Sequence, residues 1–220
     1  MSLNKLIQFD RRYKCPLIGV DEAGRGALAG PLYAAAVHVP ALSSPKRLKL
    51  PDWCLEINDS KQLNPQKRQM LSDLIKGNFA YAIAKVSVNE IEQLGLSTAN
   101  QLAMHRAVMN LLDSLPPTVT YLILVDGIVR IKTLFQVQEL IKGGDGRSFQ
   151  IACASILAKV ARDQALGKLH EDDPRYNWAQ NKGYGTSEHF AQIRSHGACK
   201  EHRSIFLRKL LQRFELPSVQ

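Results

Sequence analysis

The chain of 220 residues has the length of one ordinary domain and can bury a core without a disulfide or a metal staple. Its 45% hydrophobic and 22% charged residues are typical of globular proteins, and 14 glycines with 10 prolines exclude collagen-like and low-complexity classes. Lysine and arginine outnumber the acidic residues by 29 to 20, so the net charge of +9 favours an anionic partner such as nucleic acid. No apolar run approaches the ~18 residues of a membrane span. The first 15 residues lack the apolar core of a signal peptide, so we expect a cytoplasmic protein without a membrane partner.

Strands alternate with helices in the first half of the sequence. We expect, in chain order, strands over 17–20 and 32–39, a helix over 64–76, a strand over 79–88 and a helix over 97–114. Asn64 can cap the first of these helices, and Pro65 suits the first helical position. Ser97 is the expected cap of the second helix.

The second half continues the alternation and ends in a basic helical part. The apolar run over 119–125 predicts the most hydrophobic strand, and residues 148–169 predict a helix of small side chains. We expect an α/β fold with a mixed sheet flanked by helices. Residues 1–170 would form the main unit, and residues 171–220 a helical C-terminal extension of the same structural unit.

Acidic residues follow both of the strongly apolar strands. Asp21 and Glu22 end the first strand, and Asp126 ends the strand over 119–125. If these strands are parallel neighbours, their carboxylates meet at one edge of the sheet, where active sites of α/β proteins gather. Converging carboxylates need a cation, and oxygen ligands favour Mg²⁺ or Mn²⁺. Asp145 is a further candidate ligand. Each of the four acids taken singly is better explained as a turn or cap residue, and it is their joint pattern that favours a site.

A glycine-rich turn follows the first acidic pair. In Gly24-Arg25-Gly26 the backbone could approach a phosphate or hydroxyl closely, although a tight turn explains the same residues. The turn is not a P-loop, because the required Lys-Ser/Thr pair is missing. Lys61 in Asp59-Ser60-Lys61 could likewise face a phosphate, whereas the alternative is a capping segment before the helix at Asn64.

Taken together, these motifs resemble those of the bacterial ribonuclease HII family, from residue 18 to about 206. The motifs that carry the resemblance are Gly19-Val20-Asp21-Glu22-Ala23-Gly24-Arg25-Gly26 with Gly30-Pro31, Asp59-Ser60-Lys61, Val125-Asp126-Gly127, Lys142 with Asp145, Ala154-Ser155-Ile156-Leu157-Ala158-Lys159-Val160 with Arg162-Asp163, Asn181-Lys182-Gly183-Tyr184-Gly185-Thr186, and His202-Arg203. The resemblance implies a ribonuclease H-like fold with a helical C-terminal extension that contacts substrate.

The resemblance also implies an activity and a set of site residues. It implies an endonuclease that hydrolyses the RNA strand of RNA–DNA hybrids and cuts on the 5′ side of single ribonucleotides in duplex DNA, using two Mg²⁺ or Mn²⁺ ions. The implied metal ligands and catalytic residues are Asp21, Glu22, Asp126 and Asp145. Gly24, Arg25 and Gly26 would read the 2′-hydroxyl, Tyr184 would pack on the deoxyribose that follows the ribonucleotide, and Lys61 would lie beside the substrate phosphates.

Two alternatives and several secondary expectations accompany this interpretation. The related ribonuclease HIII family shares the chemistry but carries an additional N-terminal domain, whereas only about 16 residues precede the first strand here. A non-catalytic nucleic-acid-binding module is the other alternative, although such a module has no use for four clustered acids. We expect a monomer, an ion pair between Asp163 and Arg162, and a phosphate contact at Arg203; His189 and His202 are either substrate-facing or surface residues.

Overall fold

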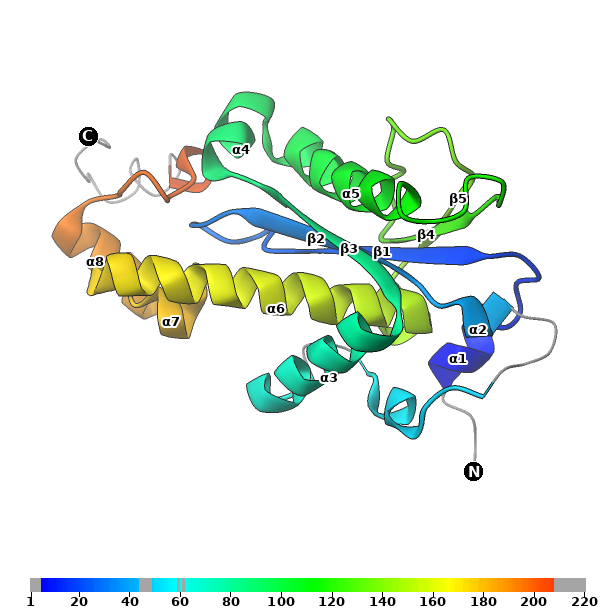
Figure 1. Cartoon of the computed structure of the whole chain (residues 1–220). Coiled ribbons are helices and arrows are strands. Elements are labelled where there is room, and N and C mark those ends of the chain that lie inside the picture. Colours follow the sequence, from blue (N-terminus) through cyan, green and yellow to red (C-terminus); the bar gives the residue numbers. More distant parts are fainter. Residues whose placement is uncertain (1–4, 44–48, 59, 61, 208–220) are drawn as a thin grey trace.

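The computed structural model describes residues 5–43, 49–58, 60 and 62–207, which fold around one five-stranded sheet (Figure 1). The strands are β1 (Leu17–Ala23), β2 (Leu32–His38), β3 (Ala80–Val86), β4 (Leu122–Asp126) and β5 (Gln138–Ile141). In the order β3-β2-β1-β4-β5, the first three strands pair antiparallel, whereas β4 runs parallel to β1 and β5 parallel to β4. The predicted mixed sheet is therefore confirmed.

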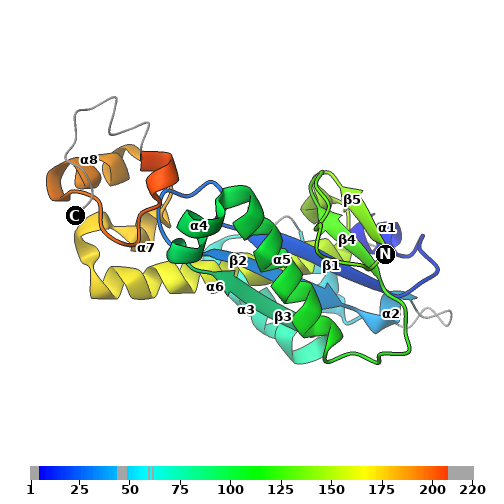
Figure 2. The ribbon, with the colours of Figure 1, turned by 90° about the horizontal axis from the view of Figure 1, so that it is seen from above.

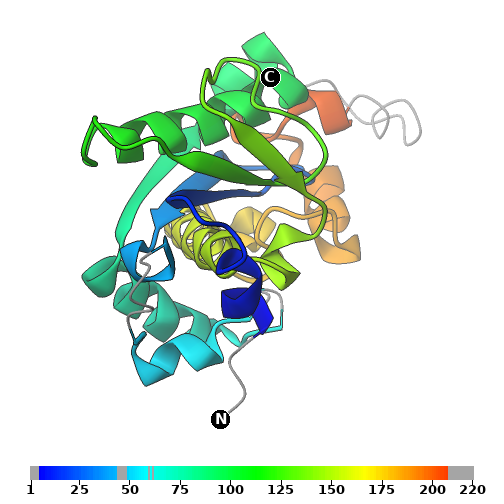
Figure 3. The ribbon, with the colours of Figure 1, turned by 90° about the vertical axis from the view of Figure 1, so that its right-hand side faces the viewer.

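Helices cover both faces of this sheet, as the views in Figures 1 and 3 show. The helices are α1 (Lys5–Asp10), α2 (Pro40–Ser43), α3 (Pro65–Asn78), α4 (Val88–Leu94), α5 (Leu96–Leu112), α6 (Phe149–Asp172), α7 (Trp178–Asn181) and α8 (Ser187–His196), with 3-10 turns at Asp52–Glu56, Gly144–Gly146 and Pro174–Tyr176. Helix α5 packs on one face against β1, β2 and β3, and α6 packs on the other against β1 and β2. Each face has its own apolar core.

The long helix α6 begins at a cap and passes very close to β1. The side chain of Ser148 accepts a hydrogen bond from the backbone N–H of Ile151, which confirms the predicted start of this helix. A Cβ atom on Gly19 would lie 2.4 Å from the backbone of Gln150 and Ile151. Glycine in the middle of β1 therefore lets the first turn of α6 rest directly on the strand that carries the first acidic pair.

Beyond the sheet, α6 continues into the C-terminal helical part (Figure 2). There α7 and α8 pack around a separate apolar cluster that includes Leu28, Leu166, Tyr176, Trp178 and Ile193. The expected division at residue 170 falls in the last turn of α6, and the division remains a prediction. No helix in the described part of the chain is both long and apolar enough to cross a membrane.

Several element boundaries differ from those expected. Strand β1 continues through Asp21 and Glu22 to Ala23, because its backbone stays paired with β2 up to that residue. Ser97 is not a cap: Gly95, with φ of 76°, joins α4 directly to α5. Strand β4 begins only at Leu122, later than expected. The Asn64 cap is confirmed by a 2.8 Å hydrogen bond from the N–H of Lys67.

Candidate active site

Asp21 and Asp126 lie side by side on two adjacent parallel strands, Asp126 as the last residue of β4 and Asp21 two residues before the end of β1. The register pairs Val20 with Val125, so the next residue on each strand is an aspartate. Directly opposed residues on neighbouring strands project from the same face about 5 Å apart. The expected meeting of the two strand ends is confirmed.

Burial and the negative charges of neighbouring carboxylates raise the pKa of Asp21 and of Glu22. The pKa of Asp21, which is 4% exposed, lies well above its ordinary value, first because of burial and then because of the negative charges of Glu22 and Asp126. The pKa of Glu22 is raised by burial and by Asp126, against the opposing effect of Arg25. The backbone N–H of Glu22 donates to Asp21 Oδ1 at 2.7 Å. The three carboxylates therefore share one electrostatic environment that disfavours full ionisation.

The fourth candidate, Asp145, is attached to the same region through the backbone. It lies in the 3-10 turn that precedes α6, is 8% exposed, and accepts from the N–H of Gly146 at 3.0 Å. The adjacent Gly144 donates its N–H to Asp126 Oδ1 at 2.6 Å. The turn is thus fixed to Asp126, although Asp145 itself does not line the cavity described next.

A cavity of about 500 Å³ unites most of the predicted site residues. Its lining consists of Asp21, Glu22, Ala23, Gly24, Arg25, Gly26, Ser60, Asp126, Ser155, Lys159 and Tyr184. Sequence reasoning gave no role to Ser60, Ser155 or Lys159, although all three fall in motifs that it singled out. Ser60 Oγ lies 3.0 Å from Ser155 Oγ, on the side of Asp21 that faces α6. Lys61 lies outside the described residues.

The donor set fits a hard divalent cation, although its side chains are not yet gathered around one position. Carboxylate oxygens are the ligands that Mg²⁺ and Mn²⁺ prefer, and a dication would neutralise the repulsion that raises the pKa of Asp21 and Glu22. Within the described part of the chain, no three acidic, histidine or cysteine side chains are already gathered around a single metal position. Binding would therefore draw these neighbouring carboxylates together.

Two buried arginines hold the glycine-rich turn in place. Arg203 donates to the carbonyl oxygens of Gly24, Arg25 and Gly30 at 2.6–3.2 Å. It is fully buried, so the predicted phosphate contact at Arg203 is wrong. Its guanidinium instead satisfies carbonyls that the turn leaves unpaired.

The second arginine, Arg162, connects the segment that follows this turn to the loop that carries Tyr184. It donates to the carbonyls of Pro31, Ala29 and Lys182 at 2.8–3.3 Å. Gly24 has φ of 93°, and a Cβ there would lie 1.9 Å from Arg162 Nε. A side chain at residue 24 would therefore displace this arginine.

The remaining charged and histidine residues depart from the sequence interpretation. Asp163 is ion-paired as expected, but its partners are Lys159 at 2.8 Å and Arg68 at 3.6 Å rather than Arg162. His189 and His202 are 0% and 5% exposed, so neither faces substrate or solvent. Both belong to the core of the C-terminal helical part.

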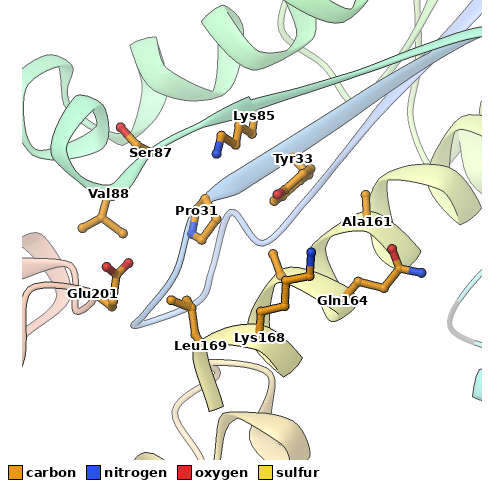
Figure 4. Close-up of a pocket in the computed structure, with 11 residues that line it drawn as sticks. Pro31, Tyr33, Lys85, Ser87, Val88, Ala161, Gln164, Lys168, Leu169 and Glu201 are labelled. Carbon is orange, nitrogen blue, oxygen red and sulfur yellow. The ribbon is translucent and has the colours of Figure 1, made fainter. Parts of the chain in front are cut away.

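A second cavity, of about 480 Å³, lies between α6 and the ends of β2 and β3 (Figure 4). Lys85, Lys168 and Tyr33 contribute polar groups to it, and Glu201 is its single carboxylate. Its lining shares no residue with the acidic cavity. The clustered acids therefore single out the first cavity as the candidate active site.

Comparisons with known proteins agree with this geometry. The family model described as ribonuclease HII matches residues 18–211. The chain is 43% identical to a ribonuclease HII of Fusobacterium nucleatum over 95% of this chain and 93% of that one. It is 48% identical to ribonuclease HII 1 of Methylibium petroleiphilum over 86% of this chain and 88% of that one.

Solved structures confirm the fold. The ribonuclease H2 of Pyrococcus horikoshii superposes with a TM-score of 0.67 at 26% identity, covering 91% of this chain and 99% of that one. A Bst-RNase HIII in complex with Mn²⁺ gives a TM-score of 0.66 at 19% identity, and the match spans only 65% of that longer chain. The sequence matches, the fold and the acidic strand ends all lead to one conclusion: the chain belongs to the ribonuclease HII family and is an endoribonuclease that acts on RNA–DNA hybrids.

Proposed function

We propose that this enzyme also incises duplex DNA on the 5′ side of a single embedded ribonucleotide, with Asp21, Glu22, Asp126 and Asp145 holding two divalent ions. The observation that carries the proposal is the shared cavity, in which three of these acids lie together with Gly24–Gly26 and Tyr184. One cavity thus offers both the groups that would hydrolyse the phosphodiester and the groups that would recognise the sugar.

The acids at the ends of β1 and β4 would hold the metal. Mg²⁺ or Mn²⁺, when bound, lowers the pKa of a coordinated water and neutralises charge on the phosphodiester. Asp21 and Asp126, as neighbours on parallel strands, would be the central ligands, and Glu22 and Asp145 would complete the set. The rigid strand pairing fixes the spacing of the two central carboxylates.

The glycine-rich turn would recognise the 2′-hydroxyl. In the described part of the chain, the N–H groups of Arg25 and Gly26 donate to no acceptor, so they are available to a ligand. A Cβ on Gly26 would meet no atom within 4 Å, which leaves open space against this backbone. The 2′-hydroxyl is the group that separates RNA from DNA, and it can accept these hydrogen bonds.

Tyr184 would detect the step from RNA to DNA. Its side chain is 37% exposed and lines the cavity, while its ring lies 5.1 Å from the Arg162 guanidinium and 5.7 Å from Lys159 Nζ. A ring that packs flat on the sugar after the ribonucleotide leaves little room for a further 2′-hydroxyl. Aromatic contacts with nucleic acid contribute about 1–3 kcal/mol by analogy with base stacking.

The experiment compares two substrates: a DNA duplex with one ribonucleotide, and an all-RNA strand paired with DNA. With Mg²⁺ or Mn²⁺ the wild type should cut both, and a chelator should stop both reactions. Tyr184→Ala should lower the single-ribonucleotide rate more than the hybrid rate, whereas Tyr184→Phe should keep most of the preference. An unchanged rate ratio in Tyr184→Ala would remove Tyr184 from substrate recognition.

A further inference from the structure

A chain of buried hydrogen-bonding side chains runs through the C-terminal helical part and ends at the backbone of Tyr184. His189 Nδ1 lies 2.9 Å from the Tyr184 carbonyl oxygen. On the other side of the ring, His189 Nε2 lies 3.3 Å from Trp178 Nε1 and 3.1 Å from His202 Nε2. His202 Nδ1 in turn lies 3.1 Å from the backbone nitrogen of Cys199.

Only one arrangement of protons places a donor opposite an acceptor in each of these contacts, with the lone pair of His189 Nε2 shared between Trp178 and His202. The Tyr184 carbonyl can only accept, so His189 Nδ1 must carry its proton, and in a neutral ring Nε2 is then an acceptor. Trp178 Nε1 can only donate, which agrees with that assignment. The Cys199 N–H can only donate, so His202 Nδ1 is an acceptor and His202 Nε2 donates to His189.

Burial keeps both rings in this neutral state. Desolvation is the main cause that lowers the pKa of His189, and it lowers the pKa of His202 to about 4 with a further contribution from His189. A second proton on either ring would also place two donors against each other, at Trp178 or at Cys199. The donor at His189 Nδ1 is therefore fixed at neutral pH.

The backbone of His189 also takes part in the hydrogen bonds of the short segment between Tyr184 and α8. Thr186 caps α8 by accepting from the N–H of His189 at 3.1 Å, and its own N–H donates to the Tyr184 carbonyl at 2.8 Å. The Tyr184 N–H donates to Asn181 O at 2.9 Å. Lys182 and Gly183 anchor the start of this loop through Arg162 and Leu28, and His189 adds a buried contact at Tyr184 itself.

We propose that His189 is a positioning residue that sets substrate preference: its Nδ1–H holds the Tyr184 carbonyl and thereby fixes the Tyr184 ring in the acidic cavity. The proposal rests on the role given to Tyr184 under the proposed function. His189 touches neither substrate nor the reacting atoms, so its loss should change discrimination between substrates more than it changes hydrolysis itself.

Two amide substitutions separate the contacts of the imidazole. In His189→Asn the amide stands near the place of Nδ1 and can still donate to Tyr184, but it cannot reach Trp178. In His189→Gln the amide stands near the place of Nε2, so it can meet Trp178 and His202 but no longer holds Tyr184. The readout is the ratio of the single-ribonucleotide rate to the all-RNA hybrid rate, which is independent of the fraction of active enzyme.

We expect His189→Gln to lower this ratio about five-fold, the size of one lost hydrogen bond, and His189→Asn to keep it within about two-fold of wild type. Equal ratios in the two variants would overturn the proposal, because a purely structural histidine predicts that result. If Tyr184→Ala leaves the ratio unchanged, the proposed function of Tyr184 fails; if it changes the ratio and His189→Gln does not, the positioning role alone fails.

A measurement on the unaltered protein covers the case in which the variants fail to fold. Nitrogen-15 NMR of the wild-type imidazoles should show His189 protonated at Nδ1 only and His202 protonated at Nε2 only at pH 7. A His189 ring protonated at Nε2 alone would overturn the proposal, because Nδ1 could then not donate to the Tyr184 carbonyl oxygen.

Discussion

The two sides of the candidate active site are built in opposite ways. On the acidic side, Asp21, Glu22 and Asp126 repel one another, and burial adds to the cost of their charges. On the recognition side, Arg203 donates to carbonyls of the glycine-rich turn, Arg162 to carbonyls of the flanking segments, and His189 to that of Tyr184. One side carries unfavourable electrostatic energy in the free protein, whereas the other is held in place.

This contrast predicts how each side should respond to metal and to substrate. The acidic side becomes stable only when a cation arrives, so its conformation and its pKa values should respond strongly to metal. The recognition side already has its hydrogen bonds and should change little when substrate binds. Substitutions on the acidic side should therefore remove activity but leave folding stability nearly unchanged. Substitutions of Arg162 or Arg203, which we call the arginine clamp, should lower both activity and stability.

Asp126→Asn should give the largest loss of activity. A neutral amide cannot hold a shared dication, so several kcal/mol of transition-state stabilisation are lost, corresponding to about 10³-fold in rate. Because one repulsive charge is removed, the metal-free variant should unfold at the same or a higher temperature than wild type. A variant that keeps a tenth of the wild-type rate would exclude Asp126 from the metal site.

Asp10 is also a buried carboxylate, but it does not line the acidic cavity. Its ionisation should make the stability of the fold depend on pH. Burial raises its pKa to about 7, and its carboxylate accepts from the N–H of Gln150 at 2.9 Å. Between pH 4 and 7 the folded protein holds this proton and the unfolded chain does not, so the free energy of unfolding falls as pH rises.

The Asp10 contribution should reach about 4 kcal/mol, fully lost above pH 7. Asp10→Asn should flatten that part of the stability profile, as measured by urea unfolding at pH 5 and pH 8. Parallel profiles for the variant and the wild type would show that Asp10 keeps its ordinary pKa in the fold.

Arg203→Lys should break the clamp on the recognition side. An ammonium cannot reach the carbonyls of Gly24, Arg25 and Gly30 together, and each carbonyl left unpaired costs about 1–3 kcal/mol. We expect a loss of about 2–3 kcal/mol in stability and slower cleavage of both substrates. Arg130→Lys, at an exposed position, is the control and should change neither quantity.

Gly26→Ala should give the smallest and cleanest effect. The space beside Gly26 is open in the free protein, so thermal stability should change by less than about 0.5 kcal/mol. If the ribose packs against this backbone, the added methyl should lower cleavage about ten-fold. Gly167→Ala, equally open but in α6 away from the cavity, should leave cleavage unchanged. Equal cleavage rates for Gly26→Ala and Gly167→Ala would show that substrate does not pack against Gly26.

Local signals were enough to predict much of this fold. The cap at Asn64 was predicted because capping depends on neighbours in sequence, and the start of α6 near Ser148 was also predicted. The same signal at Ser87 and Glu90, which form a capping box, marks the start of α4 and was overlooked. Strand β5 escaped prediction because its four residues, Gln138–Ile141, carry no clear apolar alternation.

The acidic residues that follow apolar strands were predicted from the sequence. The buried residues that hold distant segments together were not. Asp21 and Asp126 follow apolar strands, so their proximity needed only parallel pairing. The burial of Arg203 depends on carbonyls more than 170 residues away, and that of His189 on partners brought together by α7 and α8. Charge alone therefore placed Arg203 on the surface, in the wrong environment.

Metal binding without substrate tests the acidic side most directly. Mn²⁺ should be titrated into the wild type and Asp126→Asn while the unfolding temperature is followed, with Asp113→Asn, an exposed acid at the end of α5, as control. The account predicts that Mn²⁺ raises the unfolding temperature of the wild type and of Asp113→Asn but not that of Asp126→Asn. An equal rise in all three proteins would contradict the assignment of the metal to the ends of β1 and β4.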